Sequence, residues 1–71
     1  MATLKLCIDG MAGHDDETRI ELALRDEPGV LGVVANHEAA CAEIEYEDDE
    51  VSLDRILEVV QELGYPTEVG G

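Results

Sequence analysis

The side chains most able to do chemistry in this sequence are two thiols, Cys7 and Cys41, and the pair His14 and Asp16. His14 and Asp16 have a His-x-Asp spacing, which can supply a nitrogen and an oxygen to Zn²⁺ or Ni²⁺. Neighbours in one short flexible turn rarely converge on a single ion, however. The alternative is that these groups cap and solvate a helix N-terminus, where the positive end of the helix dipole favours carboxylates and disfavours a cation.

Two further polar features, a histidine in a turn and an acidic run, are not predicted to bind a metal ion. His37 is followed by Glu38 in a tight connection between two predicted strands, so we interpret it as a surface histidine. The acidic run 45–50 lacks the alternating ligand spacing and the central glycine of an EF-hand calcium loop. That run is typical of a solvated acidic loop.

Alternating apolar residues predict the strands that would position these groups. The predicted strands are 4–9, 30–36, 39–46 and 67–69. In the second strand the inward set is Leu31, Val33 and Ala35.

Apolar residues at helical spacing predict two helices. The first covers 14–25, and the second begins after Ser52 as its N-cap and ends before Gly64. The resulting order βαββαβ is that of an α+β ferredoxin-like sandwich. In that fold two helices cover one face of a four-stranded antiparallel sheet.

The same alternation predicts where the two thiols lie. The first and third strands of a ferredoxin-like sheet are adjacent, and matching their inward residues puts Cys7 opposite Cys41 on the solvent face. Matching the second strand to the third pairs Val33 with Ala42 and places Val34 beside Cys41. Opposed residues have Cβ atoms about 4.5–5.5 Å apart, which suits shared ligation of a soft ion or a disulfide. The alternative is that both cysteines are small apolar fillers, and a register slip of two would separate them.

Several segments resemble the heavy-metal-associated domains, the small fold of copper chaperones and of modules in copper-transporting ATPases. They are Gly10-Met11-Ala12-Gly13-His14-Asp15-Asp16, Ile20-Glu21-Leu22-Ala23-Leu24, Gly29-Val30 and Glu62-Leu63-Gly64-Tyr65. In that family the first segment typically reads Gly-Met-Thr-Cys-x-x-Cys, and its two thiolates hold the metal. Here Gly13 and Asp16 stand at the cysteine positions. The resemblance therefore implies the fold, while the usual copper ligands are missing from the loop.

The length and charge of the chain limit its class. Seventy-one residues suffice for one core, so we expect residues 1–71 to form a single heavy-metal-associated-like domain. Eighteen acidic residues against four basic ones give a net charge of −14, which repels nucleic acid and anionic membranes. Abundant carboxylates with scarce lysine suggest adaptation to high salt. With neither a signal peptide nor an apolar span in view, we expect a cytoplasmic monomer that is not inserted in a membrane.

These features favour a small non-catalytic binding module of the heavy-metal-associated type with a degenerate metal loop. The sequence has no Ser-His-Asp set, no buried carboxylate pair and no nucleotide loop, so we do not expect an enzyme. Metal handling would use non-standard ligands, either Cys7 with Cys41 or His14 with Asp16, and the cofactor would be a soft transition-metal ion. The alternative is a protein–protein interaction or regulatory module that has lost metal binding. An acidic surface would select a basic protein surface or a metal-transport partner.

Overall fold

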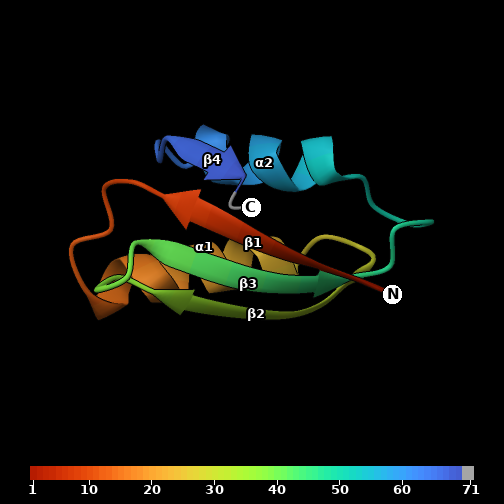
Figure 1. Cartoon of the computed structure of the whole chain (residues 1–71), viewed down its shortest axis with the longest axis horizontal. Coiled ribbons are helices and arrows are strands. Elements are labelled where there is room, and N and C mark those ends of the chain that lie inside the picture. Colours follow the sequence, from red (N-terminus) through yellow and green to blue (C-terminus); the bar gives the residue numbers. More distant parts are fainter. Residues whose placement is uncertain (70–71) are drawn as a thin grey trace.

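Six elements follow one another in the computed structural model of the chain, which describes residues 1–69. They are β1 (Ala2–Ile8), α1 (His14–Arg25), β2 (Val30–Asn36), β3 (Cys41–Tyr46), α2 (Leu53–Glu62) and β4 (Thr67–Val69). Residues 70 and 71, the last two of the expected domain, lie outside the described part. The strands form an antiparallel sheet in the order β2-β3-β1-β4, and α1 lies behind β2 and β3 in Figure 1. The predicted ferredoxin-like fold is confirmed.

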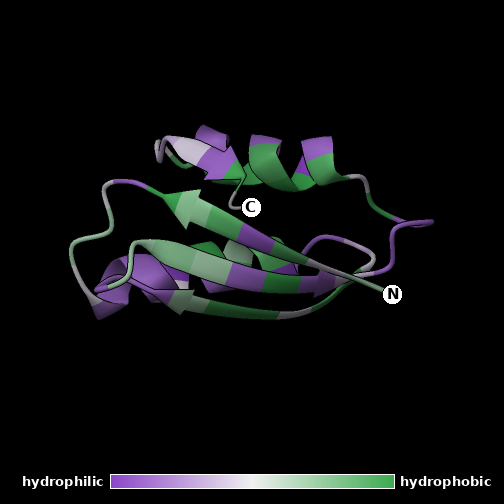
Figure 2. Cartoon of the chain, viewed as in Figure 1, coloured by the Kyte–Doolittle hydropathy of each residue, from purple (hydrophilic) through white to green (hydrophobic). Residues whose placement is uncertain are grey.

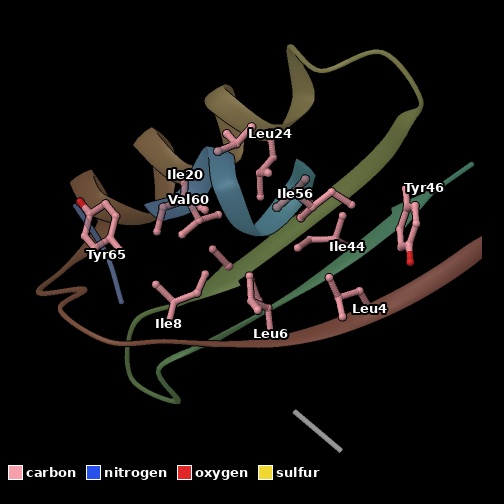
Figure 3. Close-up of a cluster of buried hydrophobic side chains, with 14 of the residues drawn as sticks. Leu4, Leu6, Ile8, Ile20, Leu24, Ile44, Tyr46, Ile56, Val60 and Tyr65 are labelled. Atoms are coloured by element: carbon pink, nitrogen blue, oxygen red, sulfur yellow. The ribbon is translucent and has the colours of Figure 1, made fainter. Parts of the chain in front are cut away.

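The core lies between the two helices and one face of the sheet. Alternate residues of a strand point to the same face, and in β1 every second side chain from Leu4 to Ile8 is buried while those between are exposed. The completely buried side chains are Leu6, Ile8, Ile20, Leu24, Ile44, Ile56 and Val60. Figure 3 shows them facing one another, with Tyr65 at one end of the cluster beside the start of α1 and Tyr46 at the other. Packing of aliphatic side chains therefore holds the helices on the sheet.

The helix boundaries agree with the sequence signals. The helix α1 begins and ends at the predicted residues, 14 and 25. The N-cap of α2 is Ser52, whose Oγ accepts a hydrogen bond of 3.1 Å from the backbone N–H of Arg55. Beyond its last turn, Gly64 has a φ of +97°, the left-handed conformation that commonly ends a helix. None of the helices among residues 1–69 is long and apolar enough to cross a membrane.

The register between β2 and β3 differs from the prediction by two residues. Val33 lies opposite Ile44 rather than Ala42, and Asn36 rather than Val34 lies opposite Cys41. Inward residues still face inward, because side-chain direction repeats every two residues along a strand. Alternation therefore could not distinguish the two registers.

The turn between β2 and β3 explains the shift. It covers four residues, 37–40, where the sequence suggested two, and β3 begins at Cys41 rather than Ala39. The side-chain Oδ1 of Asn36 accepts hydrogen bonds from the backbone N–H groups of Glu38 and Ala39, at 3.0 and 3.2 Å. The last turn residue, Ala40, has a φ of +53°. An asparagine that organises its own turn in this way lengthens the connection.

The prediction that Leu31 points inward was wrong: Leu31 is 54% exposed. The register of β2 against β3 shifts between Val30 and Gly32. Such a bulge reverses the direction of side chains on one side of it. Val30 is therefore the residue that packs against the core at this end of β2.

Among the glycines of residues 1–69, Gly29, between α1 and β2, is expected to be the least tolerant of substitution. Its φ is +94°, and a Cβ built on it would lie 2.9 Å from the Cβ of Glu50 and 3.0 Å from the Cγ1 of Val51. We expect Gly29→Ala to lower the free energy of unfolding by about 2–4 kcal/mol, as measured by urea denaturation in molar KCl.

Gly64→Ala is the matched control for this substitution. Gly64 has a similar φ of +97° but no atom within 4 Å of the added Cβ, so it reports the backbone strain alone. That strain should cost about 1–2 kcal/mol. Equal losses in the two variants would contradict the claim that Glu50 and Val51 are too close for a side chain.

Candidate metal centre

A potential metal-binding cluster lies at the N-terminus of α1. The helix begins at His14, so His14 and Glu17 are three residues apart and share one side of its first turn. The third member, His37, belongs to the turn after β2. One ligand atom from each of His14, Glu17 and His37 lies within 4.8 Å of the others.

Glu17 is the central residue of this cluster. Its Oε1 lies 2.9 Å from His14 Nδ1, and its Oε2 lies 2.7 Å from His37 Nδ1. The backbone N–H of His37 also donates to Oε2, at 2.6 Å. The two imidazole rings meet edge to face, with centroids 5.1 Å apart. Each carboxylate oxygen therefore faces one histidine.

The surroundings of Glu17 keep it negatively charged. The backbone N–H of His37, followed by the imidazoles of His37 and His14, lowers the pKa of the Glu17 carboxyl from 4.5 to about 2. The side chains of Glu17 and His37 are 14% and 22% exposed, whereas that of His14 is 88% exposed. The cluster thus has a mostly covered half, formed by Glu17 and His37, and an exposed half, formed by His14.

Two imidazole nitrogens and one carboxylate oxygen form a donor set for a divalent ion of the zinc class. Bonds of about 2.0–2.1 Å to a tetrahedral ion would put neighbouring donors about 3.3 Å apart. The observed spacings of 2.9 and 2.7 Å are those of hydrogen bonds to two different oxygens of Glu17. The ligand atoms of the three residues lie within 4.8 Å of one another, so the side chains would have to rearrange around an ion. Three protein donors would leave a fourth position for water or for another ligand.

Asp16, which the sequence grouped with His14, has other partners. Its Oδ2 accepts a hydrogen bond of 2.8 Å from the backbone N–H of Ala12, and its Oδ1 accepts one from the hydroxyl of Tyr65. The Tyr65 hydroxyl is the main cause of the lowered pKa of the Asp16 carboxyl, and Asp16 in turn raises the pKa of the Tyr65 phenol. Asp16 therefore joins the loop before α1 to the segment after α2, and the cluster contains His14 without it.

His37 is the residue of this cluster that the sequence did not reveal. We interpreted it as a surface histidine, but its ring is mostly covered and paired with Glu17. Twenty positions separate the two residues in the chain, so neither motif nor spacing connects them. The contact depends on α1 packing along β2. The only signal available was a histidine in a turn next to a strand that the fold places beside α1.

Cys7 and Cys41 lie directly opposite each other in the β1–β3 register, as the alternation predicted. Both are free thiols on the sheet face that the helices leave uncovered; Cys7 is exposed and Cys41 is half-buried. Among residues 1–69 neither belongs to the His14–Glu17–His37 cluster. The structure therefore separates the two pairs of predicted ligands into two places.

Solved structures similar to this chain include domains from copper-transporting proteins. A copper binding domain from HMA7, a P-type ATPase, is 20% identical, with a TM-score of 0.95 over 100% of this chain and 96% of the other. Oxidized MerP from Ralstonia metallidurans CH34 is 23% identical, with a TM-score of 0.92 over 99% and 97% of the two chains. The N-terminal domain of a potential copper-translocating P-type ATPase from Bacillus subtilis, solved in the Cu(I)-loaded state, is 29% identical. Its TM-score is 0.91 over 97% of this chain and 86% of that domain.

The fold is that of the heavy-metal-associated domains. No protein-family model matches the sequence, and a comparison with curated proteins finds no match either. The likeness is therefore one of architecture more than of sequence. Within this heavy-metal-associated fold, Gly13 to Asp16 occupy the junction between the first loop and α1, and His14 of the cluster belongs to that junction.

Proposed function

We propose that this chain is a small, non-catalytic metal-binding module with a degenerate loop, which holds a divalent ion of the zinc class at His14, Glu17 and His37. The observation that carries the proposal is the convergence of three ligand atoms within 4.8 Å at the start of α1. The similar domains in copper-transporting ATPases and the CopZ metallochaperone support metal binding as the general activity. The compartment we propose is the cytoplasm, where most protein thiols are free, as Cys7 and Cys41 are in this structure.

The donors at the usual copper positions do not fit Cu(I). Gly13 has no side chain, and Asp16 offers hard oxygens that already accept hydrogen bonds from Ala12 and Tyr65. A soft monovalent ion prefers thiolates, whereas imidazole and carboxylate suit Zn²⁺ and Ni²⁺. The change of donor type therefore supports a change of metal class.

The exposure of the cluster is consistent with transfer of an ion to a partner. Glu17 and His37 are mostly covered and would fix the ion, whereas His14 lies at the surface and could release its bond first. An incoming ligand from a metal-transport partner could occupy the fourth position. The acidic surface of the module would favour a partner with a basic docking face.

Calorimetric titration with ZnCl₂ and NiCl₂ in molar KCl tests this proposal. The parent protein carries Cys7→Ser and Cys41→Ser, so that thiols contribute no binding. We expect one ion per chain, and a loss of affinity of roughly tenfold or more in each of His14→Gln, Glu17→Gln and His37→Gln. Circular dichroism of each variant checks that the fold is retained.

Asp15→Asn is the matched control for this experiment. Asp15 lies in the same first turn of α1 but is not part of the cluster. The substitution Asp15→Asn removes one negative charge, as Glu17→Gln does. Its affinity should stay within about threefold of the parent, because only long-range attraction is lost. Equal binding by all four variants would mean that surface carboxylates collect the ion without a site.

The alternative is a protein-interaction or regulatory module that binds no metal. One observation favours it: Glu17 already accepts hydrogen bonds from His14 and His37, so the cluster also has a purely structural explanation. The absence of any binding heat for the parent protein, with the fold intact, would favour this alternative.

A further inference from the structure

The backbone hydrogen bonds define the kind of cross-strand pair that Cys7 and Cys41 form. The N–H of Ile8 donates to the carbonyl of Ala40 at 2.9 Å. That bond joins the residue after Cys7 to the residue before Cys41, which makes Cys7 and Cys41 a non-hydrogen-bonded pair of an antiparallel ladder. Such pairs have Cα atoms about 4.5 Å apart and closely spaced side chains. A disulfide needs a Cα separation of about 4.4–6.8 Å, so the folded backbone already satisfies it.

The pair is also open to small reagents. Cys7 is exposed, and it lines a pocket of about 350 Å³ together with Ala40, Pro66 and Thr67. Cys41 is half-buried beside it. A small disulfide or thiol can therefore reach Cys7 first, with Cys41 as the neighbouring thiol.

We propose that Cys7 and Cys41 are a reversible dithiol–disulfide pair that low-molecular-weight disulfides oxidise in the folded protein. The Cys7 thiolate attacks one sulfur of the small disulfide and expels a thiolate, leaving a mixed disulfide on Cys7. The Cys41 thiolate then attacks Cys7 Sγ and expels the second small thiolate. The two cysteines lose two electrons and two protons in total, and one small disulfide is reduced to two thiols. Excess small thiol reverses both steps.

This pair shares no residue with the proposed metal centre, because neither cysteine belongs to the His14–Glu17–His37 cluster. Cys41 lies opposite Asn36, the residue before His37. Its closure joins β1 to β3, two strands that are already neighbours, so the fold changes little. A disulfide between residues 7 and 41 would lower the chain entropy of the unfolded state, and this would stabilise the folded state. Oxidation should therefore raise the melting temperature by roughly 10–25 °C.

Titration of the reduced, folded protein with oxidised glutathione in molar KCl tests the inference. After alkylation of the remaining thiols, mass spectrometry should show a product that has lost two hydrogens and carries neither alkyl groups nor glutathione. Cys7→Ser and Cys41→Ser should each stop at a glutathione adduct. A wild-type protein that accumulates two glutathione adducts, or whose thiols are alkylated independently, would overturn the proposal.

A displaced pair provides the control for register. In Lys5→Cys with Cys7→Ser, the new thiol stays on the same sheet face but lies opposite Glu43, diagonal to Cys41. Diagonal neighbours are about 7–8 Å apart, beyond the usual disulfide range, so closure should be slower by roughly tenfold or more. Equal rates for the two pairs would show that the link forms in unfolded chains, which would also overturn the proposal.

Discussion

Cysteines introduced together at positions 13 and 16 are expected to raise the affinity of the loop for Cu(I) by on the order of 10⁴-fold or more, because two soft thiolates replace a position without a donor and a hard carboxylate. The loop can accept both residues. A Cβ built on Gly13 meets no atom within 4 Å, and the φ of Gly13 is −179°, an extended value that any residue adopts. The N-terminus of α1 would also favour the thiolate form. Gly13→Cys/Asp16→Cys should therefore create a working Cu(I) site on a scaffold that is already suitable.

Competition with a chromophoric Cu(I) chelator under reducing conditions measures this gain. Both proteins carry Cys7→Ser and Cys41→Ser, and Gly13→Ser/Asp16→Ser serves as the control of similar size without sulfur. The serine variant loses the same hydrogen bonds from Ala12 and Tyr65 to Asp16 that the cysteine variant loses. The explanation of the degenerate loop fails if both double variants compete equally for Cu(I), since the donors would then not decide the affinity.

The melting temperature is expected to rise by roughly 10 °C or more between 0.1 M and 3 M KCl. The excess negative charges, a net charge of −14, repel one another within a chain of 71 residues, and the core contains no Phe or Trp. Arg55 offsets part of the repulsion by pairing with Glu27 at 2.8 Å and with Glu58 at 2.9 Å. Salt shortens the range of the remaining repulsion, from about 10 Å at 0.1 M to about 3 Å at 1 M.

The acidic turn before α2 offers a variant that tests the cause of this salt dependence. Figure 2 shows the turn around residues 47–50 as a hydrophilic protrusion, and residues 48–50 are exposed. Asp48→Asn/Asp49→Asn/Glu50→Gln should stabilise the protein at low salt and reduce the slope of melting temperature against salt. Sucrose in place of KCl distinguishes screening from a general effect of solutes. A melting temperature that does not change with KCl would refute the halophilic interpretation.

Periodicity predicted the architecture well because each element has a strong local signal. Apolar residues at helical spacing and the Ser52 N-cap predicted where α2 begins and ends. Alternation in β1 and β3 correctly predicted that Cys7 lies opposite Cys41. The register of β2 was out of reach, because a shift of two residues leaves every side chain on its predicted face. The side chain of Asn36 decides that register through its turn hydrogen bonds.

The candidate site was predictable only in part, for a different reason. His14 was singled out from its spacing to Asp16, but Asp16 is bound to Ala12 and Tyr65. In the structure His14 is grouped with Glu17 and His37 rather than with Asp16. His37 approaches Glu17 only when α1 packs along β2. Tertiary contacts of this kind leave no trace in local spacing.

The position of His37 would link the lifetime of the protein to the proposed ion. An ion held by Glu17 and His37 would connect two segments that are 20 residues apart, in a chain whose two thiols are free. Unfolding would release the ion, so a free-ion concentration of one hundred times the dissociation constant would stabilise the folded state by about 2.7 kcal/mol. Empty copies would unfold more often and be degraded first. The amount of this protein in a cell would then follow the supply of its metal, without any change in its synthesis.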